Sequence, residues 1–162
     1  METVVRIHKE SEYNEILQQA VAVIETARGN AARAIVSTSN EMHWRIGQLL
    51  YERKLDSSHG AGVVKRLFAD LKAMYPKMGM SVSNLWAMKK YYVRFHLSEP
   101  KLQRSVGVLP WRHINQLMPK LKEDDNAIQY YADKTIENGW ACANEIFKDS
   151  YCMGFLGVTE PH

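Results

Sequence analysis

The chain has 162 residues, of which 46% are hydrophobic and 24% charged, and its formal net charge is +3. This length suits one domain with a real core, and the composition excludes an intrinsically disordered chain. No apolar run approaches the roughly 20 residues that cross a bilayer, and the first residues lack the apolar stretch of a secretory signal. We therefore expect a cytoplasmic protein with no membrane partner.

The first periodic segment runs from about residue 11 to residue 54. Its apolar side chains recur at steps of three or four, as on one face of an amphipathic helix: Ile16, Ala20, Val23, Ala27, Ala31 and Ile35. Because the segment is longer than an ordinary globular helix, the sequence predicts two helices or one kinked helix. The expected breaks are Gly29-Asn30 and residues 37–40. Residues 56–60 have the composition of a loop.

Two further helices are predicted between residues 62 and 96. The first runs from Gly62 to Tyr75, and Pro76 ends it. A turn of residues 76–80 follows, and Ser81 is a good N-cap for the second helix, which reaches about His96. Successive residues of a helix are about 100° apart. The side of this second helix that faces the core is therefore predicted as Leu85, Met88, Tyr92 and Phe95.

Further helices are predicted in the rest of the chain, after a stretch in which none is assigned. Pro100 and Gly107 punctuate it, and Pro110 lies near the first turn of another helix. Helices near residues 124–138 and 140–150 follow, with the apolar residues Ile128, Tyr131, Ile136, Ile146 and Phe147. The predicted fold is mainly α, a single-domain helical bundle over residues 1–150 with a helix-turn-helix-like unit at about 62–96. Whether a small hairpin accompanies it is left open, and residues 151–162 are interpreted as a truncated linker.

Motifs of catalysis and metal binding are missing from the sequence. No two histidines have the i, i+4 spacing of a zinc helix, and Cys142 and Cys152 have no partner at metal-ligand spacing, so we expect free thiols. Two Glu-x-Lys triplets, at residues 52–54 and 99–101, follow no predicted strand and are interpreted as chance matches. We expect no catalytic residue, no metal site and no cofactor in this chain.

Positive charge gathers between residues 62 and 96. The cations there are Lys65, Arg66, Lys72, Lys77, Lys89, Lys90 and Arg94, against the single acid Asp70. Clustered lysine and arginine side chains bind nucleic acid because they release counterions from its phosphates. The predicted DNA-binding residues are Lys65, Arg66, Lys72, Lys77, Ser83, Trp86, Lys90 and Arg94.

The helix that follows Ser81 is the candidate recognition helix. Its outer side carries Ser83, Ala87, Lys90 and Arg94, with Trp86 at the flank. Small residues near the helix start, followed by cations, suit entry into a major groove with the amino end first. In that arrangement Ser83 touches a base edge or a phosphate, while Lys90 and Arg94 hold the DNA backbone.

Three observations keep other interpretations open. A charged outer face is also what a solvated helix presents, and Trp86 is equally suited to half-buried packing. The turn of about five residues is longer than that of a tight helix-turn-helix. The long first segment favours a dimerisation or protein-interaction module, because paired helices bury apolar stripes.

Several short motifs carry a resemblance that extends from about residue 12 to residue 157. In chain order they are His43-Trp44-Arg45-Ile46-Gly47, Gly60-Ala61-Gly62, Leu67 through Leu71 with Tyr75-Pro76, Gly79-Met80-Ser81 with Asn84-Leu85, Met88 and Tyr91-Tyr92, Leu109-Pro110-Trp111 with His113, Tyr130-Tyr131, Gly139-Trp140 and Phe155-Leu156-Gly157. With these motifs the chain resembles the amino-terminal domain of the YhcG-like family. These bacterial proteins join a helical domain to a PD-(D/E)XK nuclease domain. His43 and Ala61 depart from the family pattern, which has aromatic residues there.

The resemblance implies a helical DNA-binding domain, of which a winged-helix-like form is one version, that targets a metal-dependent nuclease. The nuclease motif would lie beyond His162, so the divalent metal is expected in that absent domain. The implied partners are DNA and the chain's own carboxy-terminal nuclease domain. A homodimer is a further option, which the long first segment suggests. The leading expectation is a non-catalytic DNA-binding module, and the alternative is a dimerisation or interaction module of the same nuclease.

Overall fold

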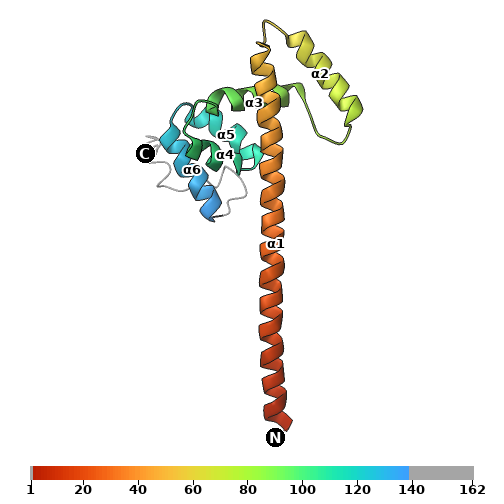
Figure 1. The fold of residues 1–162 in the computed structure, drawn as a ribbon, viewed down its shortest axis with the longest axis vertical. Coiled ribbons are helices and arrows are strands. Elements are labelled where there is room, and N and C mark those ends of the chain that lie inside the picture. Colours follow the sequence, from red (N-terminus) through yellow and green to blue (C-terminus); the bar gives the residue numbers. More distant parts are fainter. Residues whose placement is uncertain (1, 139–162) are drawn as a thin grey trace, which may run out of the picture. The chain divides into compact units, whose positions relative to one another are not determined.

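The computed structural model describes residues 2–138 of the chain, and in this part it contains six α-helices and no strand (Figure 1). The helices are α1 (Glu2–Glu52), α2 (Ala61–Met74), α3 (Val82–Phe95), α4 (Pro100–Gly107), α5 (Trp111–Leu121) and α6 (Asp125–Asn138). The prediction of a mainly α fold is confirmed for these residues, and they contain no hairpin. The chain divides into two units, with the boundary between Ile35 and Val36, inside α1.

The first unit, up to Ile35, is the amino-terminal part of α1. From residue 9 onward, where the structure describes the side chains, the large apolar residues of this unit are exposed. They are Tyr13, Ile16, Leu17, Val21, Val23, Ile24 and Ile35. Burial in this unit therefore does not account for the apolar periodicity of its sequence.

The predicted break in α1 is wrong, because the helix runs from Glu2 to Glu52 without interruption. A single glycine such as Gly29 costs a helix only about 1 kcal/mol, and α1 has no proline. Two of the polar residues that suggested a break form side-chain hydrogen bonds that leave the backbone of α1 intact. Asn30 accepts a hydrogen bond from Arg33 at 2.6 Å, one turn along the same helix. The Asn40 amide donates to the carbonyl oxygens of Gly107 and Leu109, at 2.9 and 2.6 Å.

The larger hydrophobic core of the second unit is formed by α3, α4, α5 and α6. Its fully or nearly buried members are Tyr91, Phe95, Leu102, Val106, Leu109, Ile114, Leu117, Leu121, Ala127, Ile128, Tyr131 and Ala132. Ile128 and Tyr131 lie in the core as predicted, whereas Ile136 is 51% exposed and does not. α6 begins with a cap, since the backbone N–H of Ala127 donates to the Asp124 carboxylate at 3.0 Å.

A smaller core lies where the carboxy-terminal part of α1 crosses α3 and α2. It consists of Leu50, Val64, Leu85 and Met88. Gly47 of α1 lies directly against the backbone of Met88 in α3, and a Cβ atom at Gly47 would come within 2.6 Å of the Met88 carbonyl carbon. Only glycine allows two helix backbones to approach this closely. Gly47 therefore sets the crossing of α1 and α3.

The α2–turn–α3 segment has nearly the predicted boundaries. α2 ends at Met74, before Pro76, and the Ser81 hydroxyl accepts a hydrogen bond from the Asn84 N–H at 3.0 Å, as an N-cap should. The predicted core-facing side of α3 is correct except at one position, where Tyr91 takes the place of Tyr92. Tyr91 is buried together with Leu85, Met88 and Phe95, whereas Tyr92 is only half-buried.

Helix α4 was not predicted, since Pro100 and Gly107 were interpreted only as punctuation. Pro100 is instead the first residue of the helix, a position where a missing N–H costs nothing. The Gln103 amide donates to the carbonyl oxygens of Phe95, His96 and Ser98, at 2.8, 3.2 and 3.1 Å. These bonds satisfy carbonyls left unpaired at the end of α3, which a reading of local periodicity does not reveal.

None of the described helices combines the length and the apolar character that crossing a membrane requires. Several predictions fall on residues 139–162, outside the described part. They are the helix at 140–150 with Ile146 and Phe147, the free thiols Cys142 and Cys152, and the linker at 151–162.

Candidate nucleic-acid interface

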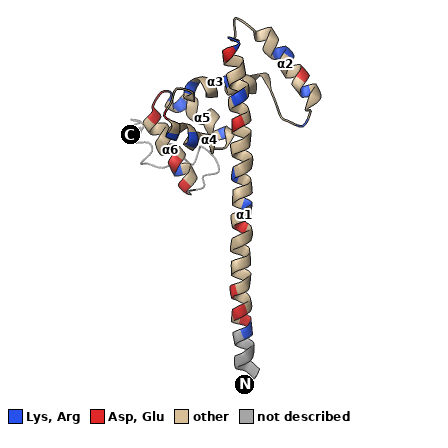
Figure 2. Cartoon of the chain, in the orientation of Figure 1, with Lys and Arg blue, Asp and Glu red and all other residues tan. Residues whose placement is uncertain are grey.

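The outer side of α2 and the turn after it carry four exposed cations of the predicted interface. Lys65, Arg66, Lys72 and Lys77 are all exposed, and Asp70 is the one acid on the helix (Figure 2). Lys65 and Lys72 are two turns apart and share one side of α2. The nearest approach between Arg66 and Asp70 is 3.9 Å, with both side chains mostly in solvent. An exposed ion pair of this kind is weak, so the Arg66 guanidinium remains accessible to an anionic ligand.

On α3, the residues predicted to face DNA do lie on one outer side, but their environments differ. Ser83 and Lys90 are exposed. Trp86 is half-buried and packs against the smaller core, which is the packing alternative considered above. The neighbouring Lys89 donates a hydrogen bond to the backbone oxygen of Leu55 at 2.6 Å and lies over the Trp86 ring. Lys90 is therefore the most accessible cation of α3.

The Arg94 side chain is mostly covered and is already paired within the protein. Its guanidinium forms an ion pair with the Asp125 carboxylate at 2.6 Å and donates to the Lys122 carbonyl at 2.7 Å. The side chain is only 16% exposed. We predicted that Arg94 holds a DNA backbone, whereas the structure gives it the role of joining α3 to the start of α6. We therefore leave Arg94 out of the interface proposed below.

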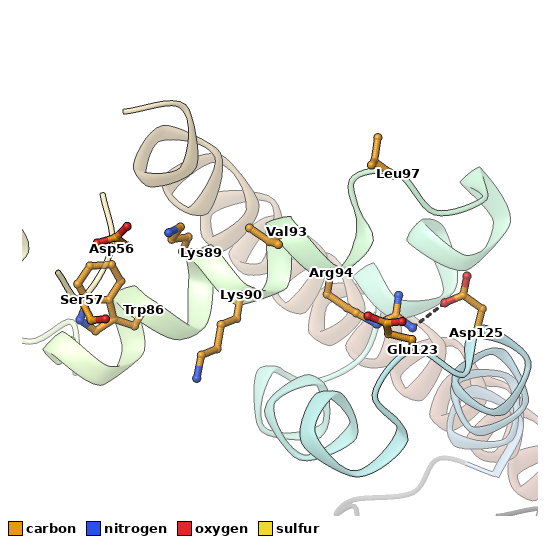
Figure 3. Close-up of a pocket in the computed structure, with 10 residues that line it drawn as sticks. All are labelled: Asp56, Ser57, Trp86, Lys89, Lys90, Val93, Arg94, Leu97, Glu123 and Asp125. Atoms are coloured by element: carbon orange, nitrogen blue, oxygen red, sulfur yellow. Dashed lines mark hydrogen bonds and ion pairs between the residues drawn. The ribbon is translucent and has the colours of Figure 1, made fainter. Parts of the chain in front are cut away.

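A groove of about 890 Å³ runs along the outer side of α3 (Figure 3). Trp86 lies near one end of it, and Leu97 and Asp125 lie near the other. Its charged lining residues are Lys89, Lys90, Arg94, Asp56, Glu123 and Asp125. Because these cations and carboxylates balance, and Lys89 and Arg94 are already bonded, this groove is poorly suited to phosphate.

A second groove, of about 700 Å³, lies between the amino-terminal half of α3 and the end of α5. Ser83, Ala87 and Lys90 line it from α3, and Asn115 lines it from α5. Among the described residues that line this groove there is one cation and no carboxylate. Several lining side chains can form hydrogen bonds: Ser81, Ser83, Asn84 and Asn115. The groove can thus accept an anionic, hydrogen-bonding ligand.

This second groove changes how α3 could meet DNA. A helix that enters a major groove has to project from its surroundings. The predicted contact residues Ser83 and Lys90 instead line a hollow that α3 shares with α5. The sequence did not predict Asn115 as a site residue, because the local pattern of α5 does not indicate that this side chain faces α3. Ser83 and Lys90 therefore do not stand on a freely projecting face of α3.

Near this groove, a cluster of buried and half-buried aromatic rings joins α1, α3 and α5. The rings of His43 and Trp111 have their centres 4.1 Å apart, and the Trp111 indole donates to the Asn84 side-chain oxygen at 2.7 Å. Trp44 packs edge-on against Tyr91 and Tyr92. Two residues of the His43–Gly47 motif thus have a structural explanation. The cluster fixes α3 and α5 relative to each other and so shapes the groove.

The acid stability of the domain should depend on His43. Burial lowers the pKa of His43 from 6.5 to about 4. Between these pH values His43 is protonated in the unfolded chain but remains neutral in the folded chain. The free energy of unfolding therefore falls as the pH is lowered from about 6.5 to 4, by at most about 3 kcal/mol from this residue, and its contribution is flat below pH 4.

The His43→Phe variant should show a smaller loss of stability over this pH range than the parent. Urea unfolding at several pH values, followed by circular dichroism, measures the difference, and carboxylates that titrate in both proteins cancel. Identical pH profiles for parent and variant would show that the folded domain accepts the proton on His43 without cost.

Among the described residues, no group of three or more His, Cys, Asp or Glu side chains could hold a metal ion. A sequence model of one protein family, described as the DUF1016 N-terminal domain, matches residues 19–148. No curated protein and no solved structure matches the chain.

Proposed function

The chain belongs to the DUF1016 N-terminal domain family, and from this premise and the cationic surface of α2 and α3 we propose that it is a non-catalytic DNA-binding domain. The observation that carries the proposal is the exposure of Lys65, Arg66, Lys72 and Lys77 beside a single acid. Such a local excess of accessible cations favours phosphate, and the net charge of +3 for the whole chain does not oppose it.

In the proposed complex, the cations contact the DNA backbone and do not read its sequence. Lys65 and Lys72 are about 10 Å apart along the axis of α2, which is two helical turns. Phosphates follow one another every 3.4 Å or so along each strand, so both lysines can reach one strand. Contacts of this kind position a protein on DNA without specifying a base.

The groove between α3 and α5 supplies the proposed second contact. Lys90 provides its positive charge, and Ser83 and Asn115 provide hydrogen bonds. A phosphate group, or the edge of a base exposed on a single strand, matches these groups. This arrangement replaces the major-groove insertion that the sequence suggested for α3.

We further propose that the domain serves a nuclease. The support is the resemblance of the motifs between residues 43 and 157 to proteins in which such a domain precedes a PD-(D/E)XK nuclease. In this proposal the domain targets DNA, and a metal-dependent catalytic domain outside this chain cleaves it. No step of cleavage is assigned to the residues described above.

Two double variants test the proposed surface. Lys65→Ala with Lys72→Ala, and Lys77→Ala with Lys90→Ala, should each weaken binding to a random duplex. Each should also lower the slope of log affinity against log salt by about 2, because two phosphate contacts are lost. Fluorescence anisotropy with a labelled duplex of about 20 base pairs, from 50 to 300 mM salt, provides the measurement.

The matched control is Lys101→Ala with Arg104→Ala, which removes two exposed cations from α4. The control lowers the net charge equally, so it should reduce affinity slightly and leave the slope close to that of the parent. Equal losses in the control and in the α2–α3 variants would show that only net charge matters. A parent that fails to bind at 50 mM salt would refute the DNA-binding proposal itself.

A further inference from the structure

The exposed part of α1 carries a heptad pattern with no counterpart in the DNA-binding surface. Between residues 13 and 34, apolar residues recur in alternating steps of four and three: Tyr13, Leu17, Ala20, Ile24, Ala27, Ala31 and Ala34. This spacing is that of the a and d positions of a coiled coil. The three largest residues of the seam, Tyr13, Leu17 and Ile24, are 60%, 46% and 54% exposed. Each of them leaves apolar surface in water that a partner helix would cover.

Large and small residues are ordered along this seam so that two antiparallel copies place a large residue opposite a small one. When two copies run antiparallel about the level of residue 22, Tyr13 faces Ala31, Leu17 faces Ala27, and Ala20 faces Ile24. Each of these layers then joins one large residue to one alanine, which is how facing positions of a helix pair interdigitate. A parallel pair in register would place Tyr13 on Tyr13 and alanines on alanines, and so would alternate crowding with gaps.

We propose that residues 13–31 of α1 form an antiparallel coiled coil with the same segment of a second copy of this chain. The pattern selects a second copy over an unrelated helix because a two-fold interface has to be self-complementary, and this seam is. The proposal is independent of the DNA-binding function and goes beyond it.

The charges at the two ends of the segment favour the same orientation. Glu10, Glu12 and Glu15 lie at its beginning, and Arg28 and Arg33 lie near its end. In the antiparallel pair, Arg33 of one copy lies at the level of Glu10 and Glu12 of the other, and Arg28 lies at the level of Glu15, so that the basic end of each copy overlaps the acidic end of its partner. A parallel pair would bring the acidic ends together instead, and like charges across an interface oppose association.

Two valines lie beside the seam at the centre of the segment. Val21 and Val23 border the seam on its two sides and lie within one residue of the two-fold axis, so each would meet its own copy across the pair. Both valines are exposed in the single chain, at 49% and 69%. Their pairing would extend the dry interface beyond the seam at its centre.

The association is tested by sedimentation velocity on the full chain of 162 residues. We expect a dimer that persists in 1 M salt, because the seam is apolar. Leu17→Glu places one charge per chain in the seam and should raise the dissociation constant at least about 100-fold. The matched control, Gln18→Glu, adds the same charge to the outer face and should change that constant less than about 3-fold.

The orientation is tested by single cysteines in a chain whose Cys142 and Cys152 are replaced by serine. Val21→Cys should cross-link the two copies under mild oxidation, since residues 21 of the two chains are offset by only about 3 Å along the axis. Leu17→Cys should not cross-link, because residues 17 are then offset by about 15 Å. This measurement does not depend on the stability of the Leu17→Glu variant.

A parent that stays monomeric up to about 100 µM would overturn the proposal, as would a dimer that Leu17→Glu leaves intact. Efficient cross-linking of Leu17→Cys, with none for Val21→Cys, would show a parallel pair and overturn the stated geometry. A dimer with the expected response of both sets of variants supports it. None of these outcomes depends on whether the chain binds DNA.

Discussion

Replacing Gly47 by alanine is expected to lower the free energy of unfolding of the domain by about 3 kcal/mol or more. The added Cβ would lie within 2.6 Å of the Met88 carbonyl carbon and 3.1 Å of the Lys89 backbone nitrogen. Backbone atoms of a helix cannot move aside as a flexible side chain can, so α1 and α3 would have to separate. Separation exposes the smaller core around Leu50 and Met88, and overpacking alone costs about 1–3 kcal/mol.

Urea denaturation of the parent and of Gly47→Ala, followed by circular dichroism, measures this change. The matched control is Gly62→Ala in α2, where a Cβ would meet no atom within 4 Å. Alanine favours a helix over glycine, so the control should leave the free energy of unfolding unchanged or raise it by up to about 1 kcal/mol. Equal stabilities of Gly47→Ala and the parent would contradict the close crossing of α1 and α3.

The second large effect is expected at Asn40. Its side chain is 2% exposed, and its amide donates to the carbonyl oxygens of Gly107 and Leu109. Asn40→Ala removes both donors and leaves two carbonyls in the α4–α5 connection without them. An unsatisfied buried polar group costs about 1–3 kcal/mol, so we expect a loss of about 3–4 kcal/mol in the free energy of unfolding.

A second asparagine in α1 provides the control for this variant. Asn30 accepts a hydrogen bond from Arg33 in an exposed position, and Asn30→Ala should change stability by less than about 0.5 kcal/mol. Hydrogen exchange adds a local readout, because Asn40→Ala should lower protection in α4 and α5 before the rest of the domain opens. If Asn40→Ala is as stable as Asn30→Ala, the bonds to Gly107 and Leu109 contribute nothing to the fold.

The elements that the sequence predicted well are those with a local physical signal. Pro76 ends α2, and Ser81 caps α3 through a bond three residues along the chain. Pro110 directly precedes α5, whose first residue is Trp111. Such signals act within one helical turn, so the pattern of residue types is enough to read them. The helix α4 was missed because Pro100, which starts it, was interpreted as a break, and the bonds of Gln103 to the end of α3 have no local signature.

The candidate site was predicted less well than the helices, because accessibility depends on distant residues. Arg94 and Lys90 are both cations on the outer side of α3, and periodicity treats them alike. Asp125, 31 residues further along the chain, binds Arg94 and leaves its guanidinium mostly covered. Asn115 of α5 turns the outer side of α3 into the wall of a groove. Neither partner can be assigned without knowing how α5 and α6 pack.

From its residues alone, the chain is a helical protein with most of its excess positive charge between residues 62 and 96, because helix periodicity, caps and charge are local properties. Tertiary packing decided which cations stay accessible, why Gly47 has no side chain, and why residues 37–40 continue a helix that they were expected to break. Asn40 illustrates the physical reason, since its hydrogen-bond partners lie 67 and 69 residues away. A polar side chain that donates to acceptors on a distant segment no longer competes for the hydrogen bonds of its own helix backbone. Only folding brings that segment near.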